Sequence, residues 1–293
     1  MRILVATDFS TRSDAALRRA ARLAGQWPAE LVLLHVVDDD QPARLADAAR
    51  REAAALLDEM AADLRRAEGI ACSTRTVLGD LPQAIADTAE AVDAALVILG
   101  PHRPQALRDA FVGTTVERTI RTCRRPVIMA AARPGPAGAY RRILVATDFS
   151  EGADQAALEA RALGLLEPGT AVAFHAFDAP GRGLMLRAAM TEAQLQDYMA
   201  EERARARSEL AAFVGRLAMP GMQGRIAPIE GSVAGAIWDA ARGAGAGLVV
   251  VGTRSRSGLA RLLLGSVAED VLRHADPEID VLTVPPTEPG PNP

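Results

Sequence analysis

The sequence predicts an α/β fold of two tandem doubly wound domains, each built on a five-stranded parallel sheet with helices on both faces. The first observation behind this prediction is an exact repeat, because the nonapeptide Arg-Ile-Leu-Val-Ala-Thr-Asp-Phe-Ser occurs at Arg2–Ser10 and again at Arg142–Ser150. The second is that short apolar runs alternate with helix-like stretches in the same order in both halves. The third is that these apolar runs are nearly continuous, as in parallel strands buried on both faces.

The elements of the first half follow from local patterns. The helix expected at Ser13–Ala24 has its apolar residues on one face, and the long helix expected at Ala43–Ala67 carries leucine or methionine at four-residue spacing. Two shorter helices are expected at Gln83–Ala91 and Val116–Thr122. The five strands are expected at the apolar runs Ile3–Ala6, Leu31–Val37, Ser73–Leu78, Ala95–Leu99 and Val127–Ala131.

The second half repeats this order. A helix follows the first strand as far as Leu166, and Thr191 with Gln194 matches a capping box that starts a long helix ending near Leu217. Two shorter helices are expected at Ala236–Arg242 and Val267–Arg273. The strands are expected at Ile143–Ala146, Ala171–Phe177, Ile226–Ile229, Leu248–Val251 and Ile279–Val284.

The stretch between the halves, Arg133–Gly138, is rich in proline and glycine, which is typical of a linker. It divides the chain into domains 1–138 and 139–293. A formal charge of −4 offers no general attraction to nucleic acid or to acidic membranes. No apolar stretch has membrane-spanning length and the first strand leaves no room for a signal peptide, so we expect a cytoplasmic protein with reduced Cys72 and Cys123.

The chain contains no lysine, and all its basic side chains other than histidine are arginine. A phosphate loop of the Gly-Lys-Ser/Thr type is therefore excluded, as are Schiff-base chemistry and a lysine general base.

Three features recur where strands one and four end, at the edge of a parallel sheet where ligands bind. A carboxylate, Asp8 or Asp148, follows the first strand, and a glycine, Gly100 or Gly252, closes the fourth. Thirteen residues later a glycine and a hydroxyl residue stand immediately before a helix, and free N–H groups at a helix start favour anions such as phosphate. These pairs are Gly113 with Thr114 and Gly265 with Ser266.

With these features, the chain resembles the universal stress protein family over essentially its whole length, in the tandem two-domain form. The resemblance rests on Ile143–Ser150, His175, Gly231–Ile237, and the run from Val251 to Val267. It implies an adenine nucleotide alpha hydrolase-like fold and a non-enzymatic stress-response protein that binds ATP, alone or with Mg²⁺.

The resemblance also implies roles for individual residues. In the second domain the carboxylate would face the ribose or a phosphate-bound metal, the residue at the end of the second strand would line the adenine pocket, and the others would hold phosphates. These residues are Asp148, Ala176, Gly252, Ser255, Gly265, Ser266 and Val267. Their counterparts in the first domain are Asp8, Val36, Gly100, Gly113 and Thr114.

The family's nucleotide-binding motif has a middle glycine, which is replaced in both halves. Ser255 takes its place in the second half, whereas Arg103 does so in the first, next to Pro101 and Pro104. Arginine could fill the first pocket or reach a phosphate from its rim, and Pro101 removes one backbone N–H. We therefore expect the second domain to be the better nucleotide site.

Two alternatives remain open at this point: a nucleotide-free protein-interaction module of the same fold, and a slow ATPase. The resemblance further implies that the fifth strands, Val127–Met129 and Ile279–Val284, pair edge to edge. That pairing would make the chain an intrachain pseudo-dimer, which can dimerise again. His35 and His175, at matching places in the second strands, are expected to be hydrogen-bonded structural residues.

Overall fold

The computed structural model describes residues 1–101, 114–133, 140–166, 170–178, 191–253 and 264–286. The elements of the first half are β1 (Arg2–Ala6), α1 (Ser13–Ala24), β2 (Glu30–Val37), α2 (Ala43–Glu68), β3 (Cys72–Leu78), α3 (Leu81–Ala91), β4 (Leu96–Leu99), α5 (Thr115–Thr122) and β5 (Val127–Met129). Those of the second half are β6 (Ile143–Ala146), α6 (Glu151–Ala162), β7 (Ala171–Phe177), α8 (Glu192–Leu217), β8 (Gln223–Pro228), α9 (Val233–Ala244), β9 (Leu248–Gly252), α10 (Ser266–Arg273) and β10 (Asp280–Val284).

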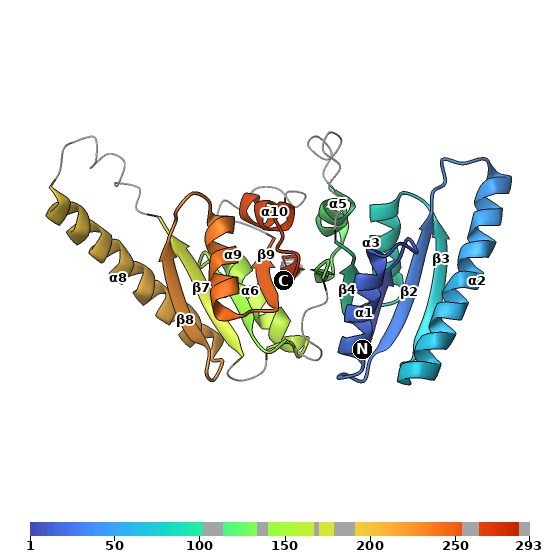
Figure 1. Ribbon diagram of the computed structural model, residues 1–293, viewed down its shortest axis with the longest axis horizontal. Helices are drawn as coiled ribbons and strands as arrows, with labels where there is room; N and C mark the ends of the chain where they lie inside the picture. The colour runs from blue at the N-terminus through green and yellow to red at the C-terminus, as the bar shows by residue number, and fades with distance from the viewer. Residues whose placement is uncertain (102–113, 134–139, 167–169, 179–190, 254–263, 287–293) are drawn as a thin grey trace, which may run out of the picture.

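All ten of these strands form one sheet, in the order β3-β2-β1-β4-β5-β10-β9-β6-β7-β8 (Figure 1). Within each half the strands are parallel, and the first strand of the half lies between the second and the fourth. The order in which successive strands are added to the sheet therefore reverses beside β1 and beside β6. Ligands bind at such switch points in doubly wound folds. The predicted fold class is confirmed.

The two halves meet through their fifth strands. β10 pairs antiparallel with β5, and Val281, Leu282 and Thr283 lie opposite Met129, Ile128 and Val127 respectively. The hydroxyl of Thr283 also donates to the carbonyl of Val127 at 3.2 Å. The predicted edge-to-edge pairing is thus confirmed within a single chain, and each fifth strand covers the edge that the other would leave open.

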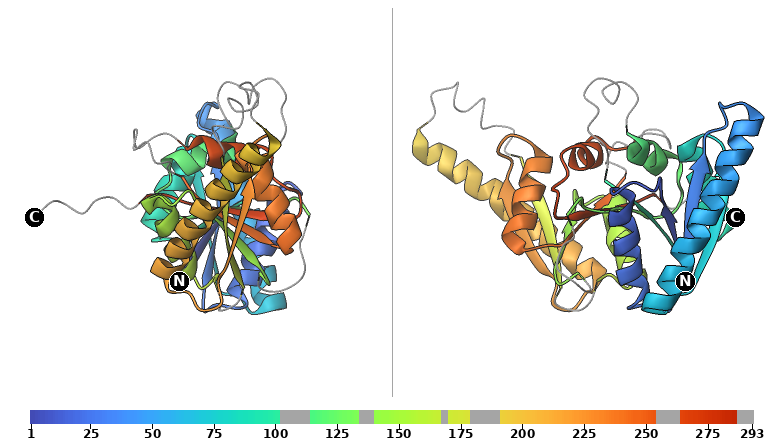
Figure 2. Two further views of the ribbon diagram at one scale, coloured as in Figure 1. Left: turned by 90° about the vertical axis from the view of Figure 1, so that its left-hand side faces the viewer. Right: turned by 45° about the vertical axis from the view of Figure 1, so that its right-hand side comes forward.

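One hydrophobic core lies on each face of the sheet and continues through both halves. The first core packs α1, α2, α6 and α8 onto the sheet, with Leu23, Leu57 and Phe213 among its buried side chains. The second packs α3, α5, α9 and α10 onto the other face, with Ile85 and Ile237 among them. Figure 2 shows helices on both sides of the twisted sheet. Among the described helices, none is long and apolar enough to cross a membrane.

The expected elements form, but several ends differ from the sequence prediction. α6 ends at Ala162 and not at Leu166, because Gly164 follows with a φ of +73°, a left-handed conformation that suits glycine and stops a helix. β8 begins at Gln223, three residues before the expected start, because the exposed residues of this edge strand pair with β7 without an apolar pattern. The predicted capping box of Thr191 and Gln194 is present.

A buried polar cluster joins the first helix of one half to the last strand of the other. The Asp280 carboxylate forms an ion pair with Arg19 and accepts hydrogen bonds from the hydroxyl of Tyr140 and, at 2.7 Å, from the N–H of Ala131. The side chains of Arg19 and Asp280 are only 7% and 1% exposed. The Arg19 guanidinium also lies over the Tyr140 ring, 4.6 Å from its centroid. Burial raises the pKa of Tyr140 well above its ordinary value, which keeps this hydroxyl a donor.

Replacing Asp280 by alanine should destabilise the protein strongly. The substitution leaves a buried arginine without its counter-charge, and the loss of one partner of such a pair costs about 3–5 kcal/mol in free energy of unfolding. Arg133→Ala is the matched control, because Arg133 meets Glu278 on the same seam at 3.5 Å with both side chains mostly exposed. Exposed pairs contribute about 0–1 kcal/mol. Urea denaturation of both variants measures the difference, and similar midpoints would refute this role of Asp280.

Candidate functional site

The repeated nonapeptide forms the same tight turn at the end of β1 and of β6. Phe9 and Phe149 have φ angles of 58° and 64°, in the left-handed region that side chains other than glycine rarely adopt. The N–H of each phenylalanine donates to the hydroxyl of the threonine two residues before it, at 3.0 Å for Thr7 and 2.9 Å for Thr147. This bond stabilises a backbone conformation that costs about 1–3 kcal/mol by itself.

The aspartate between those two residues is held by the following serine in both halves. Oδ1 of Asp8 accepts from the N–H of Ser10 at 3.0 Å and from the serine hydroxyl, and Oδ1 of Asp148 accepts from Ser150 in the same way. Because Oδ1 is engaged in the turn, Oδ2 is the carboxylate oxygen available to a ligand.

The two histidines of the second strands pack against these turns. Nδ1 of His35 lies 2.8 Å from the carbonyl oxygen of Thr7, and Nδ1 of His175 lies at the same distance from that of Thr147. The ring of Phe9 stacks on His35 with centroids 4.6 Å apart, and Phe149 contacts His175 at 4.2 Å. Each histidine therefore hydrogen-bonds to the turn and packs against its phenylalanine, which is the structural role expected from the sequence.

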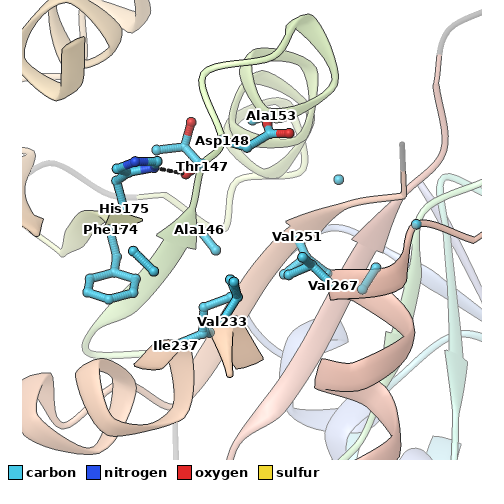
Figure 3. A pocket seen from close by; sticks show the side chains of 14 residues that line it. Ala146, Thr147, Asp148, Ala153, Phe174, His175, Val233, Ile237, Val251 and Val267 are labelled. Carbon is cyan, nitrogen blue, oxygen red and sulfur yellow. Dashed lines mark hydrogen bonds between the residues drawn. The ribbon is translucent and has the colours of Figure 1, made fainter. Parts of the chain in front are cut away.

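A cavity of about 190 Å³ lies beyond the carboxyl ends of β6, β7 and β9 in the second half (Figure 3). In Figure 3, Thr147 and Asp148 form one side of it, and Val251 and Val267 lie across from them. Apolar side chains from β7 and α9 form its floor. The described residues around the cavity are Ala146, Thr147, Asp148, Ala153, Phe174, His175, Ala176, Val233, Ile237, Val251, Gly252, Gly265, Val267 and Ala268.

The start of α10, at the rim of this cavity, carries no side-chain cap. Its N-cap residue is Gly265, which has no side chain to accept a hydrogen bond from the first turn. Among the described residues, no side chain accepts from the N–H groups of Ser266 and Val267, which lie at the positive end of the helix dipole. A helix start of this kind is favourable for an anion.

The start of the corresponding helix in the first half, α5, is capped by its own side chains. The hydroxyl of Thr114 accepts from the N–H of Glu117 at 3.2 Å, and the Glu117 carboxylate accepts from the N–H of Thr114 at 2.8 Å. Glu117 is only 2% exposed. This capping box places a negative charge where a phosphate would bind, so α5 is poorly suited to an anion.

The first-half cavity is the larger of the two, at about 300 Å³, and has a more polar lining. Arg12 and Ser13 contribute to it, whereas the second half has Gly152 and Ala153 at the positions that follow its turn. Nη2 of Arg12 lies 3.6 Å from Oδ2 of Asp8. Burial raises the pKa of Asp8, but the hydrogen bonds from Ser10 and Ser13 and the charge of Arg12 together lower it below its ordinary value. The first cavity is therefore larger and more polar, and its carboxylate has an arginine beside it.

The glycines that end the fourth strands have a structural role that the sequence analysis did not predict. A Cβ on Gly252 would lie 2.8 Å from the carbonyl oxygen of Gly152, and a Cβ on Gly100 would lie 2.8 Å from that of Arg12. Each glycine therefore leaves room for the backbone at the start of the first helix of its own half. This packing requires glycine whether or not a ligand approaches, and the expected approach to a ligand stays a prediction.

The structure brings most of the predicted site residues to the two cavities. Asp148, Ala176, Gly252, Gly265 and Val267 line the second, and Asp8, Val36, Gly100 and Thr114 line the first. Ser266 is exposed at the start of α10. The remaining predicted residues, Gly113, Ser255 and Arg103, lie outside the described residues.

The sequence analysis missed four residues that shape these cavities. Phe174 and Ile237 line the second, and their apolar character gave no sign that they face a cavity and not the core. Arg12 gave no sign of its contact with Asp8. Glu117 did carry a readable signal, since Thr114-x-x-Glu117 is the capping-box pattern.

This fold and these two cavities define a class of protein with two tandem doubly wound α/β domains, each with a cavity at its topological switch point. A model described as the Universal stress protein family matches residues 1–131 and 139–285. The chain therefore belongs to the universal stress protein family and contains two tandem domains of it.

Solved structures of similar length share the whole architecture. A universal stress protein from Archaeoglobus fulgidus DSM 4304 aligns with a TM-score of 0.69 and 19% identity, covering 97% of this chain and 95% of the other. A functionally unknown protein from Pseudomonas aeruginosa PAO1 aligns at 0.65 and 26% identity, covering 97% and 92%. A putative universal stress protein from Pseudomonas aeruginosa UCBPP-PA14 aligns at 0.63, with the same identity and coverage. A search of curated proteins found no match.

Substituting alanine for Gly252 should destabilise the protein by about 1–3 kcal/mol, the typical cost of an added group in a packed site. The new Cβ would meet a backbone oxygen at 2.8 Å, which cannot turn away as a side chain can. Gly243→Ala is the control, because nothing lies within 4 Å of a Cβ there, and removing a glycine from a helix gains up to about 1 kcal/mol. Thermal unfolding compares the two, and a Gly252→Ala protein as stable as the control would contradict this account.

Proposed function

We propose that this chain is an ATP-binding, non-enzymatic stress-response protein, with the nucleotide held mainly in the second domain. One observation carries the proposal: a single cavity has a carboxylate, Asp148, on one side and the uncapped start of α10 on the other. A ribose hydroxyl can donate to a carboxylate, and phosphates suit free N–H groups at a helix start.

The floor of the same cavity suits an adenine base. Phe174 and Ile237 offer apolar surface, and the backbone at Ala176 lies at the end of β7 where it can meet the edge of the ring. Nucleotide sites combine such apolar walls with a few fixed polar groups. The residues present therefore fit ATP, and Asp148 also suits a phosphate-bound Mg²⁺, since Mg²⁺ prefers carboxylate and phosphate oxygens.

The family membership supports the stress-response part of the proposal. The pairing of β5 with β10 joins the two domains into one unit, which can respond as a whole to a bound nucleotide. Bound ATP would then serve as a conformational or assembly signal. We include homodimerisation of the whole chain in the proposal, as a step that light scattering with and without ATP can measure.

Equilibrium binding of labelled ATP tests the proposal directly. Saturable binding at or below millimolar ATP, with one nucleotide per chain, is the expected result. No saturable binding at that concentration would refute it and favour a nucleotide-free interaction module. Steady release of phosphate from bound ATP would instead favour the slow ATPase.

The variant Gly265→Asp should separate binding from folding. Aspartate is a better N-cap than glycine by a few tenths of a kcal/mol, and the φ of −61° at this position suits any residue, so stability should hold or rise slightly. Its charge at the helix start should weaken ATP binding at least about tenfold, by like-charge repulsion.

Gly265→Ala is the matched control for that variant. It adds a Cβ without a charge, so its ATP affinity should stay within about threefold of the wild type. If alanine and aspartate weaken binding equally, crowding and not charge governs this position, and phosphate binding at α10 is refuted.

A further inference from the structure

Arg12 and Gly152 occupy equivalent places in the two halves. The carbonyl oxygen of each lies at the same 2.8 Å distance from a Cβ built on the glycine that ends the fourth strand of its half. Both residues stand at the start of a first helix, Arg12 as the N-cap of α1 and Gly152 in the first turn of α6. A side chain at either position therefore starts from the same point relative to its turn and its cavity.

The two halves differ in whether the carboxylate oxygen that a ligand could use already has a partner. Oδ1 is engaged by the turn serine in Asp8 and in Asp148 alike. In the first half Oδ2 of Asp8 lies 3.6 Å from Nη2 of Arg12, which lines the cavity. In the second half Oδ2 of Asp148 has no partner among the described residues, and Gly152 has no side chain to supply one.

We propose that the residue at this position helps to decide which pocket accepts a nucleotide: Arg12 closes Asp8 to ligands, and Gly152 leaves Asp148 open. This inference rests on the proposed ATP binding and names one residue that makes it one-sided. A guanidinium beside Oδ2 competes with ribose hydroxyls for the same oxygen, and its charge repels a divalent cation.

The proposal does not depend on the strength of the ion pair between Arg12 and Asp8. Arg12 and Asp8 are 41% and 60% exposed, and exposed pairs of this kind are weak. The arginine acts by its position, since it brings a positive charge into the cavity next to the carboxylate oxygen that the turn serine does not engage. The expected effect on affinity is therefore moderate, about tenfold.

The second pocket is the place to test this, because the Thr114–Glu117 capping box is a separate obstacle in the first. Gly152 lies in α6 with a backbone conformation that other residues adopt, so Gly152→Arg should fold. Three variants of the full chain are compared: Gly152→Arg, Gly152→Gln as a long neutral control, and Gly152→Ala as a control for helix propensity. Thermal unfolding confirms that each is folded, and equilibrium dialysis with labelled ATP and Mg²⁺ gives the affinities.

We expect Gly152→Arg to bind ATP about tenfold more weakly, with both controls within about threefold of the wild type. Arginine without effect, or glutamine with an equal loss, overturns the inference and leaves the proposed ATP binding intact. If the wild type itself shows no saturable binding, the proposed function fails and this inference fails with it. The two failures are therefore distinguishable from one set of measurements.

Discussion

The antiparallel pairing of β5 with β10 determines how the rest of the molecule is built. Each half alone is a five-stranded parallel sheet with an apolar edge strand, and only the other half covers that edge. The pairing makes one sheet and lets the two hydrophobic cores continue across both halves. The polar cluster around Asp280 also links the halves. In it the buried charge of Arg19 is paired with a carboxylate, and leaving a buried ion unpaired would be costly.

The junction between the halves also makes the starts of two corresponding helices, α5 and α10, different. Glu117 and Glu269 both lie in the first turns of their helices, α5 and α10, which flank the seam between the halves in Figure 1. Glu117 turns back to cap its own helix, whereas Glu269 is bound by Arg273 at 2.7 Å and by Arg121 of the other half at 3.4 Å. The Glu269 carboxylate, although in the first turn of α10, is therefore held by two arginines and does not cap the helix in the way that Glu117 caps α5.

The sequence predicted the architecture well because the relevant signals are local or repeated. Apolar runs, helix periodicity and the duplicate nonapeptide placed the elements along the chain and indicated parallel sheets, and the paired glycines pointed to the sheet edge where both cavities lie. Contacts between distant residues escaped prediction: nothing in the pattern around Arg19 indicates Asp280 as its partner. Phe174 was missed because a cavity-lining residue at the end of a buried strand looks like any core residue.

The repeated nonapeptide is explained by the turn itself, without any ligand. Threonine holds the strained phenylalanine, aspartate holds serine through Oδ1, and the phenylalanine packs on a histidine of the next strand. All of these contacts occur in both halves, including the half whose helix start is capped and whose Asp8 faces Arg12. An identical aspartate in each half is therefore evidence for one backbone geometry and not for two binding sites. Under the proposed function, the capacity to bind depends on residues outside the repeat, since these determine whether Oδ2 and the nearby helix start have partners of their own.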